Sequence, residues 1–191
     1  VATAEPEPMQ ATYAVNEKIY EEGFEGVTVT NDANTYEDWY YYNEGGKNYS
    51  WVSETSHTQS GNTYIPRTGS NAVFIQSLLN DNSRLTYLVS RKMDFTKHKG
   101  NNVKLSFYYI TPAWGNDINT LKVMVSRDTH TGTWEELWSS NKTDVQEWTE
   151  AVVDFSAYAG QQIYIAFVNV AGYGYCTGVD EVSIAVEGNS E

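Results

Sequence analysis

The chain has 191 residues, 40% of them hydrophobic, which is enough for one folded domain with a substantial core. Its formal net charge of −13 argues against binding to nucleic acid or to an anionic membrane surface, because both would repel it. An acidic surface is compatible with neutral sugars, with cations or simply with solubility.

The first segment of the chain is typical of a spacer. It contains Glu5-Pro6-Glu7-Pro8 among small residues, and prolines with acidic residues oppose a packed core. Such a spacer is common in lipid-anchored or exported proteins, and an ordinary disordered tail looks the same. We predict a flexible spacer over residues 1–14 and a single domain over residues 15–191, and a lipid anchor upstream of residue 1 is compatible with this organisation.

Short strand candidates separated by turn residues follow in the first half of the domain. The aromatic fraction of 14%, with 15 tyrosines, favours pleated, half-buried surfaces. An Asn- and Asp-rich segment at 31–35 predicts a turn, and the polar segment 53–71 predicts a loop. The strands predicted for this half are 18–30, 39–42, 49–52, 72–75 and 85–90.

The second half shows a clearer hydrophobic period of two, which turns one face of each strand inward. The alternating segments are 103–109, 121–126 and 181–186. Residues 163–168 are apolar on both faces, so 162–170 is predicted as a central strand covered on both sides. Further strands are predicted at 134–138 and 147–155. With no helical period of ten residues and no evident internal repeat, the chain is predicted to be all-β, a sandwich or a barrel.

Cysteine usage and hydropathy limit the compartment. Cys176 is the only cysteine, so no intrachain disulfide forms, as in a cytosolic protein or a surface protein of a bacterium that makes few disulfides. No segment reaches the ~20 apolar residues of a membrane span, so no membrane insertion is expected. The chain starts at Val1 without a visible signal peptide, as expected if a leader has been removed or omitted.

A series of short motifs runs along most of the chain in a definite order. They lie at Glu22-Gly23-Phe24-Glu25-Gly26, Trp39, 70–75, 88–95, 105–109, 121–126, 148–167 and Gly178-Val179-Asp180-Glu181-Val182. Their order and spacing resemble the cleaved-adhesin (choice-of-anchor J) domains of Bacteroidetes surface proteins, which are similar to eukaryotic MAM domains. The resemblance implies a jelly-roll β-sandwich of two antiparallel sheets, an extracellular or cell-surface location, and a binding rather than a catalytic role.

Three departures from the family pattern leave the ligand open. The Asp-Gly-Asp-Gly turn of the adhesin repeats is replaced by Asn31-Asp32-Ala33-Asn34. The MAM disulfide cysteines are absent, and the second acidic residue of the terminal motif is Glu181.

A calcium site is the first candidate constellation. The resemblance implies that calcium is held at the Phe-Glu and terminal Asp positions, which are Glu25 and Asp180 here. Calcium takes 6–8 oxygen ligands, and Asp32, Asn34 and Asp117 are predicted to complete its shell. The alternative is that all five are turn and strand-end residues of a very acidic protein.

A sugar-binding aromatic surface is the second candidate. Sugars stack their apolar C–H faces on aromatic rings, while polar groups fix their orientation. The predicted ligand-binding residues are Trp39 and Tyr41 in an aromatic run, and Trp114 and Tyr173 in loops beside glycine. The alternative is that these rings belong to the core, as we expect for Trp134 and Trp148.

Catalysis has little support in the sequence. The histidines His57, His98 and His130 stand in polar segments without a partner motif, and no Gly-x-Ser-x-Gly elbow occurs. We therefore predict a non-catalytic extracellular module that binds a glycan or a host or surface protein, with no nucleic acid as partner. A glycan-processing jelly-roll enzyme and a structural accessory domain remain the alternatives.

Overall fold

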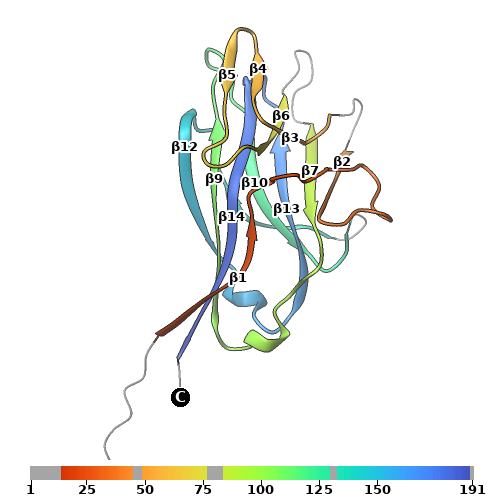
Figure 1. Ribbon diagram of the computed structural model, residues 1–191, viewed down its shortest axis with the longest axis vertical. Helices are drawn as coiled ribbons and strands as arrows, with labels where there is room; N and C mark the ends of the chain where they lie inside the picture. The colour runs from red at the N-terminus through yellow and green to blue at the C-terminus, as the bar shows by residue number, and fades with distance from the viewer. Residues whose placement is uncertain (1–13, 45–48, 77–83, 130–132, 190–191) are drawn as a thin grey trace, which may run out of the picture.

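The computed structural model describes residues 14–44, 49–76, 84–129 and 133–189, which form two antiparallel sheets packed face to face (Figure 1). The strands are β1 (Ala14–Glu22), β2 (Trp39–Glu44), β3 (Val52–Glu54), β4 (His57–Gln59), β5 (Asn62–Tyr64), β6 (Ala72–Gln76), β7 (Leu85–Ser90), β8 (Met93–Asp94), β9 (Asn102–Thr111), β10 (Thr120–Ser126), β11 (Glu135–Ser139), β12 (Val145–Asp154), β13 (Gln162–Val170) and β14 (Cys176–Asn189). Two 3-10 turns, η1 (Thr96–His98) and η2 (Ser156–Tyr158), complete the described elements. No helix in these ranges is long and apolar enough to span a membrane.

The first sheet, sheet A, is organised around its last strand. Its order is β12-β9-β14-β6-β3, and β1 also pairs with β14. One side of β14 pairs with β9, whereas the other side pairs with β6 through residues 176–179 and with β1 through residues 182–189. The register shifts between Asp180 and Ser183, and Glu181 has a positive φ of 50°. This bulge therefore lies where β14 changes its partner.

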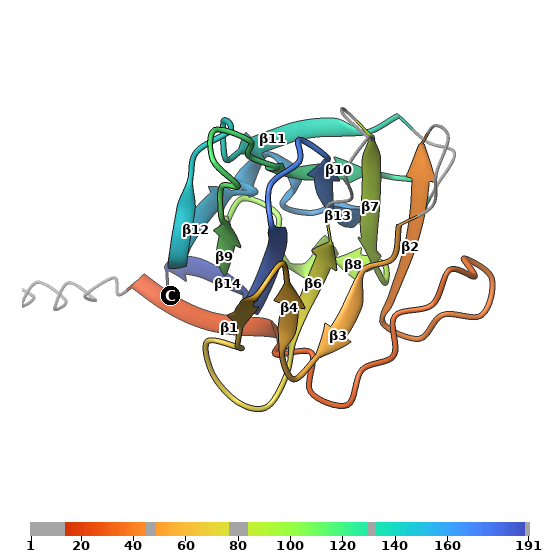
Figure 2. The same ribbon diagram turned by 90° about the horizontal axis from the view of Figure 1, so that it is seen from above.

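The second sheet, sheet B, has the order β11-β10-β13-β7-β2, with β8 pairing the lower part of β13 (Figure 2). The predicted central strand is confirmed, because β13 spans 162–170 and lies between β10 and β7. Ile165 and Phe167 point into the main core, while Ala166 and Val168 are buried on the outer face with Tyr40 and Tyr87.

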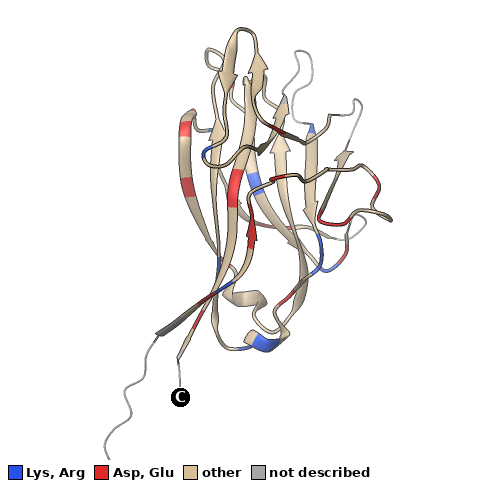
Figure 3. Ribbon diagram, in the orientation of Figure 1, with Lys and Arg blue, Asp and Glu red and all other residues tan. Residues whose placement is uncertain are grey.

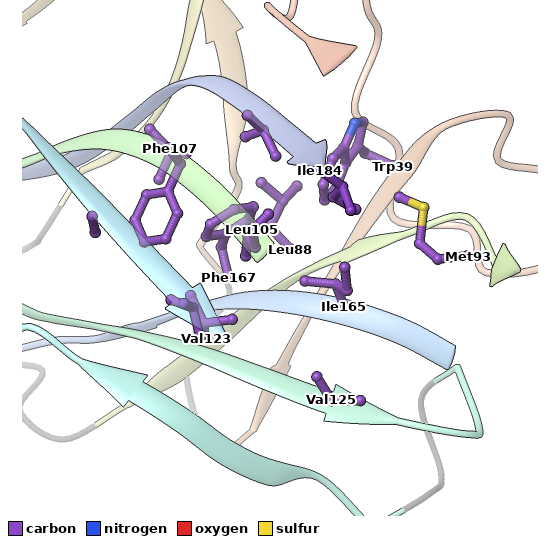
Figure 4. Packing of buried hydrophobic residues seen from close by; sticks show 14 of the residues in the cluster. Trp39, Leu88, Met93, Leu105, Phe107, Val123, Val125, Ile165, Phe167 and Ile184 are labelled. Carbon is purple, nitrogen blue, oxygen red and sulfur yellow. The ribbon is translucent and has the colours of Figure 1, made fainter. Parts of the chain in front are cut away.

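The main core lies between the two sheets and is rich in aromatic rings (Figure 4). Phe107 of sheet A meets Phe167 of sheet B edge to face, with ring centroids 5.0 Å apart. Leu105, Phe107 and Ile184 are all fully buried. Burying each side chain of this size stabilises the fold by about 1.5–3 kcal/mol, so the period of two seen in the sequence is the pattern that holds the sheets together.

The sequence-based strands are confirmed best where both faces of a strand are covered or alternate cleanly. The bounds predicted for β7 and β13 agree with the structure. The loop predicted over 53–71 is wrong, because it contains the hairpin of β4 and β5. That hairpin is polar because it lies over one sheet only, with His57 and Gln59 buried and Thr58 exposed. Residues 1–13 of the predicted spacer lie outside the described residues, and Ala14 begins β1.

The structure also reveals a local repeat that was not evident in the sequence. The segments 93–107 and 153–167 share only Asp, Phe, Gly and Phe at a spacing of 60 residues: Asp94 and Asp154, Phe95 and Phe155, Gly100 and Gly160, and Phe107 and Phe167. Phe95 has φ −107° and ψ 17°, and Phe155 has φ −108° and ψ 14°. In each segment a 3-10 turn links a strand of one sheet to a strand of the other: η1 lies between β8 and β9, and η2 lies between β12 and β13. The two turns therefore close the same end of the sandwich.

Candidate functional site

A polar groove of about 390 Å³ lies on the outer face of sheet A. It is formed there because alternation along β9 turns Leu105 and Phe107 into the core and leaves Ser106 and Tyr108 facing outward. Figure 3 shows acidic positions on β1, β12 and β14 around this part of the sheet. The lining residues are Lys18, Glu21, Glu22, Gly23, Ser106, Tyr108, Glu150, Glu181, Val182 and Ser183.

Tyr108 is the aromatic centre of the groove. The Arg67 guanidinium lies over its ring, 3.7 Å from the centroid, and donates from Nη1 to Glu181 Oε2 at 2.6 Å. A hydrogen bond between the Tyr108 hydroxyl and Glu150 raises the pKa of Tyr108, because the neighbouring carboxylate favours the protonated phenol. One ring, one cation and two carboxylates are therefore held together by mutual contacts.

Arg67 reaches the groove from a loop, residues 67–71, that two carboxylates hold in place. The backbone N–H groups of Arg67 and Thr68 donate to Asp180 Oδ2 at 2.9 and 3.3 Å. Those of Ser70 and Asn71 donate to Glu25 Oε1 at 2.8 and 2.9 Å. The loop and the bulge of β14 are thus joined beside the groove.

Gly69 is required at the middle of this loop. Its φ is +66°, and a Cβ added there would lie 2.2 Å from Glu25 Oε1. Any side chain at this position would displace the Glu25 carboxylate and add backbone strain.

The carboxylate of Asp180 has a shifted protonation equilibrium. It is completely buried beside the like charge of Glu181, and burial raises the pKa of Asp180 to about 6. Its oxygens accept N–H groups from Arg67, Thr68 and Glu181, and it forms no salt bridge within the described residues. A nearby cation would offset the cost of burying this charge.

The structure brings together two of the five residues predicted to bind a metal. Glu25 and Asp180 both contact the loop 67–71. Asp32 instead caps its own turn, accepting from the Asn34 N–H and the Thr35 hydroxyl at 2.9 Å each, and these bonds lower its pKa. Asp117 closes a separate turn with Trp114. In the described ranges, no group of three or more His, Cys, Asp or Glu residues is placed to hold a metal ion.

Two of the predicted ligand-binding rings face the core. Trp39 is only 1% exposed, packs against Phe24 and Phe167, and donates from Nε1 to Glu22 Oε1 at 2.7 Å. The prediction that Trp39 offers an exposed stacking surface is therefore wrong, because β2 turns Trp39 inward and Tyr40 outward. Tyr41 is half-buried against the same core, and its hydroxyl accepts a hydrogen bond from Ser50.

The other two predicted rings lie in neighbouring loops, 112–119 and 171–175. Trp114 stacks on Tyr175, with centroids 5.4 Å apart and planes 5° apart, and both rings are half-buried. Tyr173 has a positive φ of 65°. Buried Asn119 joins the loops, because its Oδ1 accepts the N–H groups of Gly172 and Gly174.

The sequence alone did not predict the residues that form the groove. The alternation of β9 marks Tyr108 as outward-facing, and that signal was available. Arg67, Glu150 and Glu181 come from three other segments. The pairing of β12 and β14 with β9 brings Glu150 and Glu181 to Tyr108, and the bonds of the loop 67–71 to Asp180 bring Arg67 there.

The chain matches the MAM domain family (meprin/A5/mu) over residues 30–188. The K3 cleaved adhesin domain of Lys-gingipain from Porphyromonas gingivalis W83 is similar in structure, with a TM-score of 0.62, 17% identity, and coverage of 90% of this chain and 99% of that chain. The K1 domain of the same protein gives a TM-score of 0.57 and 19% identity, covering 92% and 98%. The C-terminal family 22 carbohydrate-binding module of Clostridium thermocellum Xyn10B gives a TM-score of 0.55 and 13% identity, covering 91% and 96%. No curated protein matches the chain.

Proposed function

This chain belongs to the MAM domain family, and we propose that it acts outside the cytoplasm as a non-catalytic module that binds a glycan. The fold confirms the resemblance to cleaved-adhesin domains that the sequence indicated. The proposed binding site is the groove around Tyr108, and calcium is proposed to hold the loop beside it.

The observation that carries the proposal is the convergence of groups around Tyr108. Sugars are bound by an aromatic surface together with a few oriented hydrogen-bonding groups. The groove offers the Tyr108 ring, which carries the Arg67 guanidinium over one face, and the carboxylates of Glu150 and Glu181. The hydroxyls of Ser106 and Ser183 add a further polar pair, 2.8 Å apart.

The charge around the groove favours a neutral ligand. Four glutamates line the groove, whereas Lys18 is the only cationic residue among its described lining residues and Arg67 lies at its edge. Lys18 and Arg67 are each already paired with a glutamate, at 2.7 and 2.6 Å. An anionic sugar would meet excess negative charge here, so a hydroxyl-rich neutral glycan is the ligand that this site suits.

The similar structures support a binding role. The Xyn10B module is a carbohydrate-binding module in which amino acids of a cleft have a role in ligand binding, and the Lys-gingipain domains are cleaved adhesin domains. A surface protein of the host or of the cell is therefore the other class of partner to test.

Neutral-glycan arrays followed by calorimetry test the groove. We expect Tyr108→Ala and Glu150→Gln each to weaken binding about ten-fold or more, the loss expected when a central stacking or charged hydrogen-bonding group is removed. Glu136→Gln, on the opposite sheet, serves as the control. Trp114→Ala distinguishes the groove from the loops: if that change abolishes binding while Tyr108→Ala does not, the ligand site lies on the Trp114–Tyr175 pair.

Calcium is proposed on the hard oxygen donors of Glu25 and Asp180, together with oxygen atoms of the adjoining loop. Carboxylate and carbonyl oxygens are the ligands calcium prefers, and its charge would offset the burial of Asp180. Its contribution would be to keep the loop 67–71, and so Arg67, in position over Tyr108.

Thermal melts with calcium and with a chelator test the metal. At calcium concentrations near one hundred times Kd, we expect the melting temperature to rise by roughly 5–10 °C. Asp180→Asn and Glu25→Gln should remove that dependence, whereas Asp32→Asn should keep it. A melting temperature that calcium leaves unchanged would contradict the calcium proposal without touching the glycan proposal.

A further inference from the structure

A second groove, of about 360 Å³, lies between β1 and the segment 91–98, near the end of the sandwich from which the C-terminus emerges (Figure 1). Its walls combine apolar or aromatic side chains with cationic ones, and Figure 3 shows basic positions in blue at this end. The lining residues are Ile19, Tyr20, Arg91, Lys92, Met93, Asp94, Phe95 and His98. Its chemistry differs from that of the acidic groove on sheet A.

The basic residues here are concentrated beyond what the composition predicts. The whole chain has 12 Lys and Arg against 25 Asp and Glu, yet residues 91–99 hold four of those cations together with His98. Lys97 on η1 and Lys99 directly after it flank the lining residue His98, and both lysines are exposed.

Three of these four Lys and Arg side chains have no salt bridge among the described residues. In the part of the chain that the structure describes, Lys92, Lys97 and Lys99 form no salt bridge, whereas Lys18, Lys104 and Lys122 each pair with a glutamate. Arg91 lies over the Tyr20 ring at 5.2 Å and has only a loose contact with Asp38, 3.8 Å. In an acidic protein, positive charges left without partners at a concave surface mark a place where an external anion is favoured.

The one carboxylate that lines the groove is engaged in shaping it. Asp94 Oδ1 accepts from the Thr96 hydroxyl at 2.7 Å and from the Thr96 N–H at 2.9 Å, and these bonds lower the pKa of Asp94. Asp94 therefore holds the turn; its charge also acts on Lys97, but the two side chains form no salt bridge.

The local repeat shows that the fold does not need these cations. Where the first turn has Lys97-His98-Lys99, the second has Ala157-Tyr158-Ala159. Both turns share two backbone hydrogen bonds: His98 N–H to Phe95 O and Tyr158 N–H to Phe155 O, each at 2.9 Å, and Asn101 N–H to His98 O and Gln161 N–H to Tyr158 O, each at 3.0 Å. The lysines are thus an addition to a turn that forms without them.

We propose that this groove binds the anionic groups of an acidic polysaccharide. A uronate or sulfated sugar presents an apolar ring face and a negative group on one unit, which matches a wall of Ile19 and Tyr20 beside Arg91 and Lys92. Lys97 and Lys99 extend the positive surface for the next units of the polymer. The site goes beyond the proposed neutral-glycan groove and stands even if that groove binds nothing.

Binding of defined polymers tests the proposal. The probes are polygalacturonate for carboxylate and dextran sulfate for sulfate, with neutral dextran and poly-glutamate as comparisons, measured at low and at raised salt. We expect one or both acidic polysaccharides to bind, with an affinity that falls as salt rises because the contacts are exposed. The variant Lys97→Ala/His98→Tyr/Lys99→Ala, which copies the second turn, should weaken binding about ten-fold or more, as should Arg91→Gln.

The controls separate this site from the other one. Lys122→Ala, on sheet B, should leave polyanion binding unchanged, and the triple variant should keep any binding of neutral glycans. Failure of both acidic polysaccharides to bind would overturn the proposal, as would a triple variant that binds them as the parent does. Equal or tighter binding of poly-glutamate would overturn the assignment to polysaccharide and indicate an acidic protein instead.

Discussion

The turns at 93–103 and 153–163 share one backbone and differ in what they expose. Gly100 and Gly160 both have φ +83°, and Thr96 and Ser156 both donate their N–H to the preceding aspartate at 2.9 Å. The three residues before the glycine are Lys-His-Lys in one turn and Ala-Tyr-Ala in the other, and Tyr158 and Ala159 pack against the main core. Comparing the two turns therefore shows which residues the fold requires and which residues differ only at the surface of one turn.

The buried anchor of each turn is expected to matter most. Phe95 and Phe155 are 1% and 0% exposed and both lie in the main core. Replacing either by Ala should destabilise the protein by about 3–5 kcal/mol, because a large cavity is left, as measured by urea unfolding. Phe→Leu at each site should cost clearly less. If one turn tolerated the change and the other did not, the two would not be equivalent in the core.

Replacing each glycine by alanine should destabilise the protein by different amounts in the two turns. Gly100→Ala and Gly160→Ala each place a Cβ on a left-handed residue, a cost of about 1–2 kcal/mol. At Gly100 the new Cβ meets no atom within 4 Å, whereas at Gly160 it lies 2.9 Å from the Lys99 Cβ. Gly160→Ala should therefore be the more destabilising in unfolding experiments, and an equal loss would mean that Lys99 moves aside freely.

The same comparison explains how far sequence could go. The period of two predicted β9, β10 and the second half of β14, because the core demands an apolar residue at every second position. It did not predict the β4–β5 hairpin, whose single covered face is partly polar, or the repeat, in which only four positions are identical.

The candidate site was predicted less well than the fold. Glu25 and Asp180 were paired through family resemblance, and the structure places both on the loop 67–71. Tyr108 and Arg67, in contrast, are 41 residues apart in the sequence and meet only because the loop crosses the outer face of sheet A. No local pattern encodes such a contact, since strand order decides it.

The capping aspartates should show matched, smaller effects that depend on pH. Hydrogen bonds from Thr96 and Ser156 lower the pKa of Asp94 and Asp154 below the ordinary value of 3.8. A carboxyl with a lower pKa in the folded state adds stability above its unfolded pKa, and that stability is lost as the pH falls through the folded value. Asp94→Asn and Asp154→Asn should each lower the melting temperature at pH 7 by about 2 °C. The gap to the parent protein should close as the pH falls below the ordinary aspartate pKa, and a gap independent of pH would contradict the charge-based explanation.

The smallest expected effect on stability belongs to the exposed triplet. Lys97→Ala/His98→Tyr/Lys99→Ala should change the free energy of unfolding by no more than about 0.5 kcal/mol, because two exposed lysines and one half-buried histidine are exchanged on an unchanged backbone. The reverse change at 157–159 should cost more, since Tyr158 packs against the main core and bonds to Glu135. Denaturant unfolding of both variants measures the difference. A large loss in the first variant would make the lysines part of the fold and remove the reason for assigning them a ligand. If stability is unchanged and polyanion binding is lost, the lysines act in ligand binding and not in folding.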